Sequence, residues 1–261
     1  MPNASSGQSI TFGGGTTIRH SYCEKVDIKT IGNATSMGNM FYQCYSLQSV
    51  PLFNIINVTN MAYMFYSCVS LQSVPLFNTS NVTNMVSMFY NCFSIQSVPL
   101  FNTTNVTNMG NMFQNCQSLK SVPLFNTANV TNMTTMFYNC PSLQSVPLFN
   151  TANVTNMTIM FTSCYSLHFI PAFITTAVTS DFTTFANGCN SLNRILMSFN
   201  RTVALQNCQL SKDALVEIFT NLTNRTATTS ATIDITGNWG ASALTSADRA
   251  IATNKNWVIT G

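Results

Sequence analysis

Nine cysteines and a few ionisable side chains are the residues of this sequence whose types could do chemistry. Six of the cysteines recur every 24 residues: Cys44, Cys68, Cys92, Cys116, Cys140 and Cys164. Zinc sites usually draw on close pairs such as Cys-x-x-Cys, and the sequence contains no such pair. If the 24-residue units stack in register, equivalent cysteine side chains point in parallel and not at each other, which disfavours disulfides. The spacing therefore predicts a ladder of buried free thiols, which behave as small apolar groups.

One short segment combines different metal ligands. His20 and Cys23 lie close in the sequence to Glu24 and Asp27. A capping strand explains this segment better than a zinc site does, although the residue types leave both open. We therefore expect no metal and no cofactor.

The middle of the chain almost lacks ionisable groups. Between Asn33 and Ser180, Lys120 is the only formally charged residue, and His168 is the only other nitrogen base that can titrate. General acid–base catalysis, binding of hard metals and phosphoryl transfer all need carboxylates or clustered bases. The net charge of +3 comes without a Lys/Arg run, which argues against a nucleic-acid partner. These residues predict a scaffold or contact surface rather than an enzyme.

The cysteine spacing belongs to a longer repeat that fixes the architecture. Each unit opens with a motif such as Asn81-Val82-Thr83-Asn84-Met85, and near-identical copies follow at Asn105, Asn129 and Asn153. Apolar positions in the first part of a unit follow helical spacing, for example Val82, Met85, Met88, Phe89 and Cys92. We expect a short helix there, with Asn81 or Thr83 as its N-cap. This capping role also explains the Asn-x-Ser/Thr sequons without glycosylation.

The second part of each unit has the alternation of a strand. Val98 and Leu100 are expected to point inward, so that Ser97, Pro99 and Phe101 point outward. Two interpretations of the phenylalanines remain open: a local turn could return each ring to the core, or the rings could form an apolar contact face. The candidate binding face consists of Phe53, Phe77, Phe101, Phe125, Phe149, Phe173, Pro75, Pro99, Pro123 and Pro147. Because proline donates no hydrogen bond, we expect only two or three paired residues per strand.

One such unit cannot bury its apolar side alone, so the units must stack. The predicted fold is an α/β repeat: a leucine-rich-repeat-like solenoid of about seven 24-residue helix–strand rungs with a parallel sheet and terminal caps. We expect an N-terminal arm and capping strand over residues 1–32, the array over 33–190 and a C-terminal cap over 191–261. Within that cap, the sequence predicts strands at 202–205, 231–236 and 257–259 and helices at 211–219 and 246–254.

The repeated letters resemble a known family. Ser-Leu-x-x-Val-Pro-Leu-Phe-Asn, Asn-Val-Thr-Asn-Met, Met-Phe and the cysteine recur together, as in BspA-type leucine-rich repeats, specifically the variant found in mycoplasmal surface lipoproteins. The resemblance implies a surface-exposed repeat protein used in adhesion or host contact, and it implies no active site. The 24-residue period differs from the usual period of about 25 in that family.

The sequence thus predicts a non-enzymatic adhesion or receptor-recognition module displayed on a phage virion or bacterial surface. The alternative is a structural virion component, such as a decoration or tail protein, that packs through its apolar strand face. Expected partners are a protein or glycan on a host or neighbouring surface, or virion neighbours, with no nucleic acid and no membrane insertion. The expected location is an extracellular surface or virion, and the start of the sequence shows no signal peptide.

Overall fold

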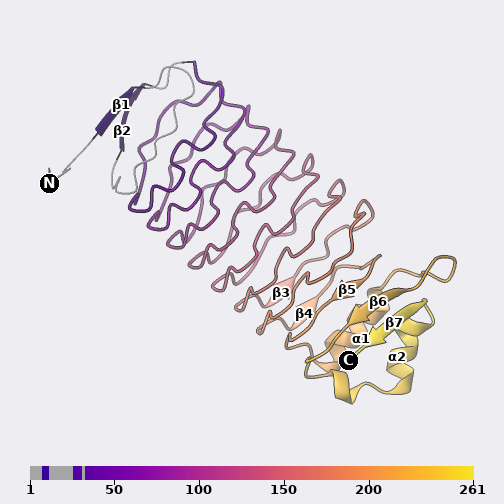
Figure 1. The fold of residues 1–261 in the computed structure, drawn as a ribbon. Helices are drawn as coiled ribbons and strands as arrows, with labels where there is room; N and C mark the ends of the chain where they lie inside the picture. Colours follow the sequence, from indigo (N-terminus) through magenta and orange to yellow (C-terminus); the bar gives the residue numbers. More distant parts are fainter. Residues whose placement is uncertain (1–7, 12–25, 31–32) are drawn as a thin grey trace.

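A computed structural model describes residues 8–11, 26–30 and 33–261. Figure 1 shows a stack of similar coils that leads from an N-terminal pair of strands to a C-terminal unit containing the helices. The N-terminal strands, β1 (Gln8–Thr11) and β2 (Val26–Thr30), pair in parallel. His20, Cys23 and Glu24 of the candidate metal cluster lie outside the described residues.

The coils stack in register with the predicted period. Parallel bridges join equivalent residues of successive rungs, from Ser36 to Asn60, then through Asn84, Asn108 and Asn132 to Asn156. Equivalent phenylalanine rings, such as Phe89 and Phe113, lie 5.6 Å apart and are nearly parallel. Because the inward side chains are nearly identical from rung to rung, only stacking of equivalent positions buries all of them. The prediction of an in-register solenoid is therefore confirmed.

The helix predicted in each rung is wrong. Residues 86–91, for example, form consecutive turns. Some backbone N–H groups close local turns, as Cys92 does to Phe89 O (3.1 Å), but intervening ones donate to the next rung, as Phe89 does to Met112 O (2.9 Å). Left-handed φ angles at Ser87 (52°) and Asn91 (59°) interrupt any helix. The apolar periodicity correctly identified the buried side of this segment but not its backbone conformation.

The predicted N-caps are absent for the same reason. Asn81, which was expected to accept a hydrogen bond at a helix start, instead donates from Nδ2 to Ile56 O of the preceding rung at 2.7 Å. Equivalent bonds recur at Asn105, Asn129 and Asn153. These asparagines stabilise the stacking of the rungs, so an inter-rung ladder replaces the capping role.

Regular strands in the array are shorter than predicted. Within the described rungs, the strand assignments are β3 (Phe169–Ile170) and β4 (Arg194–Ile195), which pair in parallel near the C-terminal end. In the preceding rungs the equivalent segment has no regular secondary structure, and each contains a proline that cannot donate to a ladder. Parallel pairing beside these segments is thus reduced to single hydrogen bonds, such as Lys120 N–H to Gln96 O at 3.1 Å, while the isolated bridges lie elsewhere in the rung, at Asn84 and its equivalents.

The C-terminal cap contains the helices and the three-stranded sheet of the described residues. Its elements are β5 (Val203–Ala204), α1 (Lys212–Asn221), β6 (Ala231–Asp234), the 3₁₀ helix η1 (Ala241–Ala243), α2 (Ser246–Thr253) and β7 (Trp257–Thr260). The strands form a parallel sheet in the order β5-β6-β7. These elements coincide with the strands and helices predicted from the sequence to within a few residues. Figure 1 shows this unit closing the C-terminal end of the stack.

Candidate functional site

The phenylalanines of the candidate binding face lie in the core, so the contact-face interpretation of these residues is wrong. Their exposed fractions are 9% at Phe53, 2% at Phe77, 1% at Phe101, 2% at Phe125, 2% at Phe149 and 3% at Phe173. Successive rings stack, with 6.5 Å between the centroids of Phe101 and Phe125 and 8° between their planes. The alternative interpretation, in which a turn returns each ring to the core, holds.

A tight turn in each rung explains this reversal. Phe101 N–H donates to Pro99 O at 2.9 Å, which closes a three-residue turn centred on Leu100. The same bond recurs at Phe77, Phe125, Phe149 and Phe173. The turn breaks the two-residue alternation, so Val98 and Phe101 both point inward while Leu100 is left at the apex.

The turn produces an exposed row of leucines. The exposed fractions are 67% at Leu52, 59% at Leu76, 58% at Leu100, 61% at Leu124 and 59% at Leu148. Five large aliphatic side chains at equivalent positions of consecutive rungs form one stripe, here called the leucine row. The sequence predicted that these leucines point inward. A sign that they do not was the adjacent Leu-Phe pair after each proline, because two neighbouring residues of a regular strand point to opposite sides.

Uncharged groups surround the leucine row. Of the candidate prolines, Pro75, Pro99, Pro123 and Pro147 are half-buried beside it. Exposed polar neighbours in the sequence are Gln, Ser and Asn, and Lys120 is the only charged side chain among the rungs that carry the row. An apolar stripe of this kind commonly marks an interface.

The cysteines form the predicted buried ladder. The thiols from Cys68 to Cys208 donate to carbonyls of the preceding rung, as Cys92 Sγ does to Phe65 O at 3.1 Å and Cys116 Sγ does to Phe89 O at 3.1 Å. The free thiols of the ladder include Cys92, Cys116, Cys140, Cys164, Cys189 and Cys208. Burial raises the pKa of the Cys208 thiol to about 12 and that of Cys92 well above its ordinary value. These buried thiols hold little thiolate at neutral pH, so they are structural groups.

Within residues 8–11, 26–30 and 33–261, no three or more His, Cys, Asp or Glu side chains gather to hold a metal ion. No helix in these ranges combines the length and apolar character needed to cross a membrane.

A second surface feature lies on the first described rungs and was missed by the sequence reasoning. Tyr42, Tyr66 and Tyr90 stack face to face, with 4.8 Å and then 4.5 Å between successive ring centroids. Tyr63 stands beside this stack, 6.0 Å from Tyr66 and tilted by 54°. The signal was present as Tyr at one position of three consecutive rungs, together with one further Tyr at residue 63.

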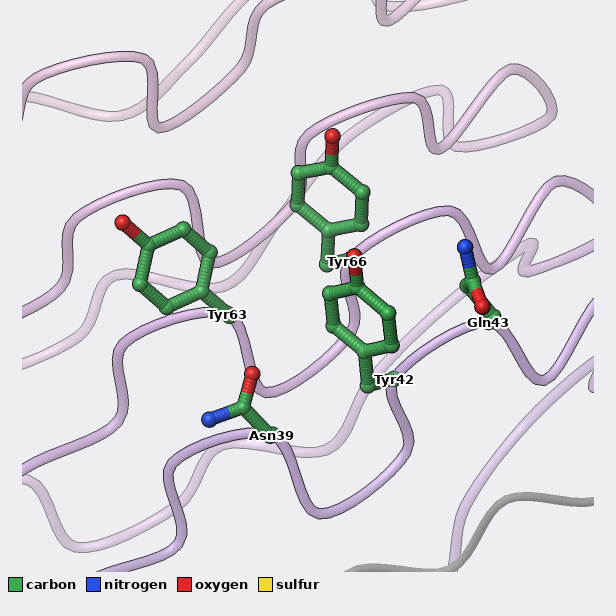
Figure 2. Close-up of a pocket in the computed structure, with 5 residues that line it drawn as sticks. All are labelled: Asn39, Tyr42, Gln43, Tyr63 and Tyr66. Carbon is green, nitrogen blue, oxygen red and sulfur yellow. The ribbon is translucent and has the colours of Figure 1, made fainter.

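These tyrosines border an open hollow of about 560 Å³ lined by Asn39, Tyr42, Gln43, Tyr63 and Tyr66. In the view of Figure 2, Tyr63 stands apart from the Tyr42–Tyr66 pair, and the Asn39 amide lies near the base of the space between them. Gln43 lies on the other side of Tyr42. We call this feature the tyrosine hollow.

Comparison with known proteins identifies related repeats. No curated protein matches the sequence. Among solved structures, a leucine-rich cell surface protein from Faecalibacterium prausnitzii A2-165 matches with 17% sequence identity and a TM-score of 0.30, over 91% of this chain and 76% of that chain. The model of a family described as "Mycoplasma protein of unknown function, DUF285" matches residues 20–121 and again residues 119–225. These two matches cover most of the sequence and support the resemblance to BspA-type repeats, so the chain belongs to the DUF285 family.

Proposed function

We propose that this chain is a non-enzymatic recognition module that attaches the surface displaying it to a partner protein through the leucine row. The observation that carries the proposal is the exposure of Leu52, Leu76, Leu100, Leu124 and Leu148 in one stripe. The leucines are anchored to a rigid core, because Phe101 and its equivalents lie directly behind them. A preorganised surface loses little conformational entropy on binding, which favours affinity.

The composition around the row supports a protein partner. The array has almost no charged side chains to desolvate, so covering this surface costs less than covering an ordinary charged one. Aliphatic side chains at the centre of an interface with a polar rim are typical of protein–protein contacts. Display on a bacterial surface is the primary context of the proposal, and display on a phage virion is the second.

Binding of the labelled protein to cultured animal cells and to bacteria, measured by flow cytometry, tests the proposal. The variant Leu100→Ser/Leu124→Ser should lose at least about tenfold in binding, since fully burying one leucine side chain contributes about 1.5–3 kcal/mol and about 1.4 kcal/mol corresponds to a tenfold change. It should keep its melting temperature, because these side chains are exposed.

The matched control is Gln96→Ser/Gln144→Ser, which changes exposed polar positions in the rungs of Leu100 and Leu148 and should bind like the wild type. A folded leucine variant that binds as well as the wild type contradicts the proposal. Tight co-purification of the protein with virions, without binding to any cell, would favour the alternative role as a structural virion component.

A further inference from the structure

We propose that the tyrosine hollow is a second binding site, which accepts a neutral saccharide of a glycan chain. The site lies on the first described rungs and uses none of the leucine row, so it goes beyond the attachment role proposed above. Its volume of about 560 Å³ is within the range of about 300–1,000 Å³ typical of small-molecule sites.

The tyrosines supply two different kinds of wall. Tyr66 is stacked between Tyr42, at 4.8 Å and 10°, and Tyr90, at 4.5 Å and 5°, so Tyr66 offers its ring edge and hydroxyl group. Tyr63 is tilted away from the stack and 37% exposed, so part of its ring surface is open to solvent. One face of a pyranose ring carries mainly C–H groups and can pack on an open aromatic surface, while its hydroxyls need polar partners.

The polar groups match those hydroxyls. Asn39 and Gln43 each present an amide oxygen that accepts and an amide nitrogen that donates, and a phenol can do both. Burial and the neighbouring Tyr90 and Tyr42 raise the pKa of Tyr66 further above its ordinary value, which is itself well above neutral pH, so the hydroxyl is uncharged. A sugar hydroxyl also both donates and accepts, so each can be paired without a formal charge.

The charge distribution selects the class of saccharide. No Lys, Arg, Asp or Glu occurs between residue 33 and Lys120, so the rungs that form the hollow contain no charged side chain. The carboxylate of a sialic or uronic acid, or a sulfate group, would lose water there without gaining a cation from these rungs. Neutral hexoses and N-acetylhexosamines avoid that cost.

The repeat offers a substitution that removes the Tyr63 ring without changing the local backbone. Equivalent positions in neighbouring rungs carry Asn39, Ser87 and Asn111, all with positive φ. A Tyr63→Asn variant therefore removes the aromatic wall and places at this position a residue that the same turn already accepts. With this variant, loss of saccharide binding can be distinguished from loss of the fold.

The test uses the full chain, a panel of neutral, sialylated and sulfated oligosaccharides, and dissociation constants from titration calorimetry and ligand-observed NMR. The wild type should bind neutral members best. Tyr63→Asn should weaken binding at least about tenfold, and Tyr63→Phe, which keeps the ring, by less than about threefold.

Two controls make the result specific. Tyr165→Ala removes a tyrosine of similar exposure, 46%, far along the array and should bind like the wild type. The leucine-row variant should keep saccharide binding, so failure of one proposal is distinguishable from failure of the other. The inference is overturned if no neutral saccharide binds at millimolar concentration, if acidic members bind better, or if folded Tyr63→Asn binds like the wild type.

Discussion

The array and the C-terminal cap solve the same problem, the burial of an apolar face, in different ways. In the cap, helices α1 and α2 begin at conventional N-caps: Ser211 Oγ accepts from Ala214 N–H at 3.2 Å, and Thr245 and Asp248 form a capping box. In the array, turns take the place of helices, and much of the backbone hydrogen bonding joins one rung to the next. The cap is encoded locally, whereas a rung acquires its conformation from its neighbours.

The array and the cap also differ in their charged side chains. Ion pairs between Arg194 and Glu217 (2.6 Å) and between Lys212 and Asp248 (2.9 Å) lie in the cap. Between residue 33 and residue 180 the corresponding roles fall to amides, as in the bond from Asn115 Nδ2 to Asn91 Oδ1 at 2.7 Å. Stacked identical rungs place each side chain beside its own copy, which would make any charge face a like charge. Asparagine avoids this because its amide is both donor and acceptor.

This contrast explains how far the sequence could predict the structure. The period, the register and the buried cysteines followed from the repeat alone, and the elements of the cap followed from ordinary local signals. The prediction of a helix in each rung was wrong. The spacing of Met85, Met88 and Phe89 indicates which side chains are buried, but it does not indicate which carbonyl accepts each backbone N–H. Bonds to a residue about 23 positions away carry no local signal.

The candidate site shows the same limit. The alternation from Val98 to Leu100 predicted the wrong side for Leu100 and left the side of Phe101 open, because alternation does not reveal the turn that the bond from Phe101 N–H to Pro99 O closes. The tyrosine hollow depends on the angle between Tyr63 and Tyr66, which repeat spacing cannot give. Residue types identified a contact surface, but backbone geometry determined which residues form it.

The largest effect should come from breaking the continuity of the array core. Phe113 is buried between Phe89 and Phe137, at 5.6 Å and 5.7 Å between ring centroids. Phe113→Ala should lower the free energy of unfolding by about 3–5 kcal/mol, because neighbouring rungs cannot close the cavity. Leu124→Ala, an exposed control, should change it by less than about 0.5 kcal/mol in the same denaturant titration. Similar losses of unfolding free energy for both variants would contradict the burial of Phe113 and the exposure of Leu124.

A smaller effect should separate helix capping from rung stacking. Ser211 accepts a hydrogen bond at the start of α1, so Ser211→Asp should be nearly neutral, since Asp is an equally good N-cap. Asn105 instead donates from Nδ2 to Ser80 O at 2.7 Å. Asn105→Asp places a carboxylate against that carbonyl and should cost about 1 kcal/mol in thermal or denaturant unfolding. A neutral Asn105→Asp would indicate that this asparagine accepts rather than donates.

The smallest predicted effect concerns a β-branched residue of the array that has left-handed backbone. Ile159 has φ 60°, in the left-handed region that β-branched residues rarely adopt, whereas Asn39 and Asn111 hold the same position in other rungs with φ 60° and 57°. Ile159→Asn relieves strain of about 1–3 kcal/mol at most but gives up some half-buried apolar area, so we expect a net gain of about 0.5 kcal/mol. The reciprocal Asn111→Ile should lower stability. Denaturant midpoints for both variants measure the difference, and a loss of stability in Ile159→Asn would mean that packing of the isoleucine outweighs its strain.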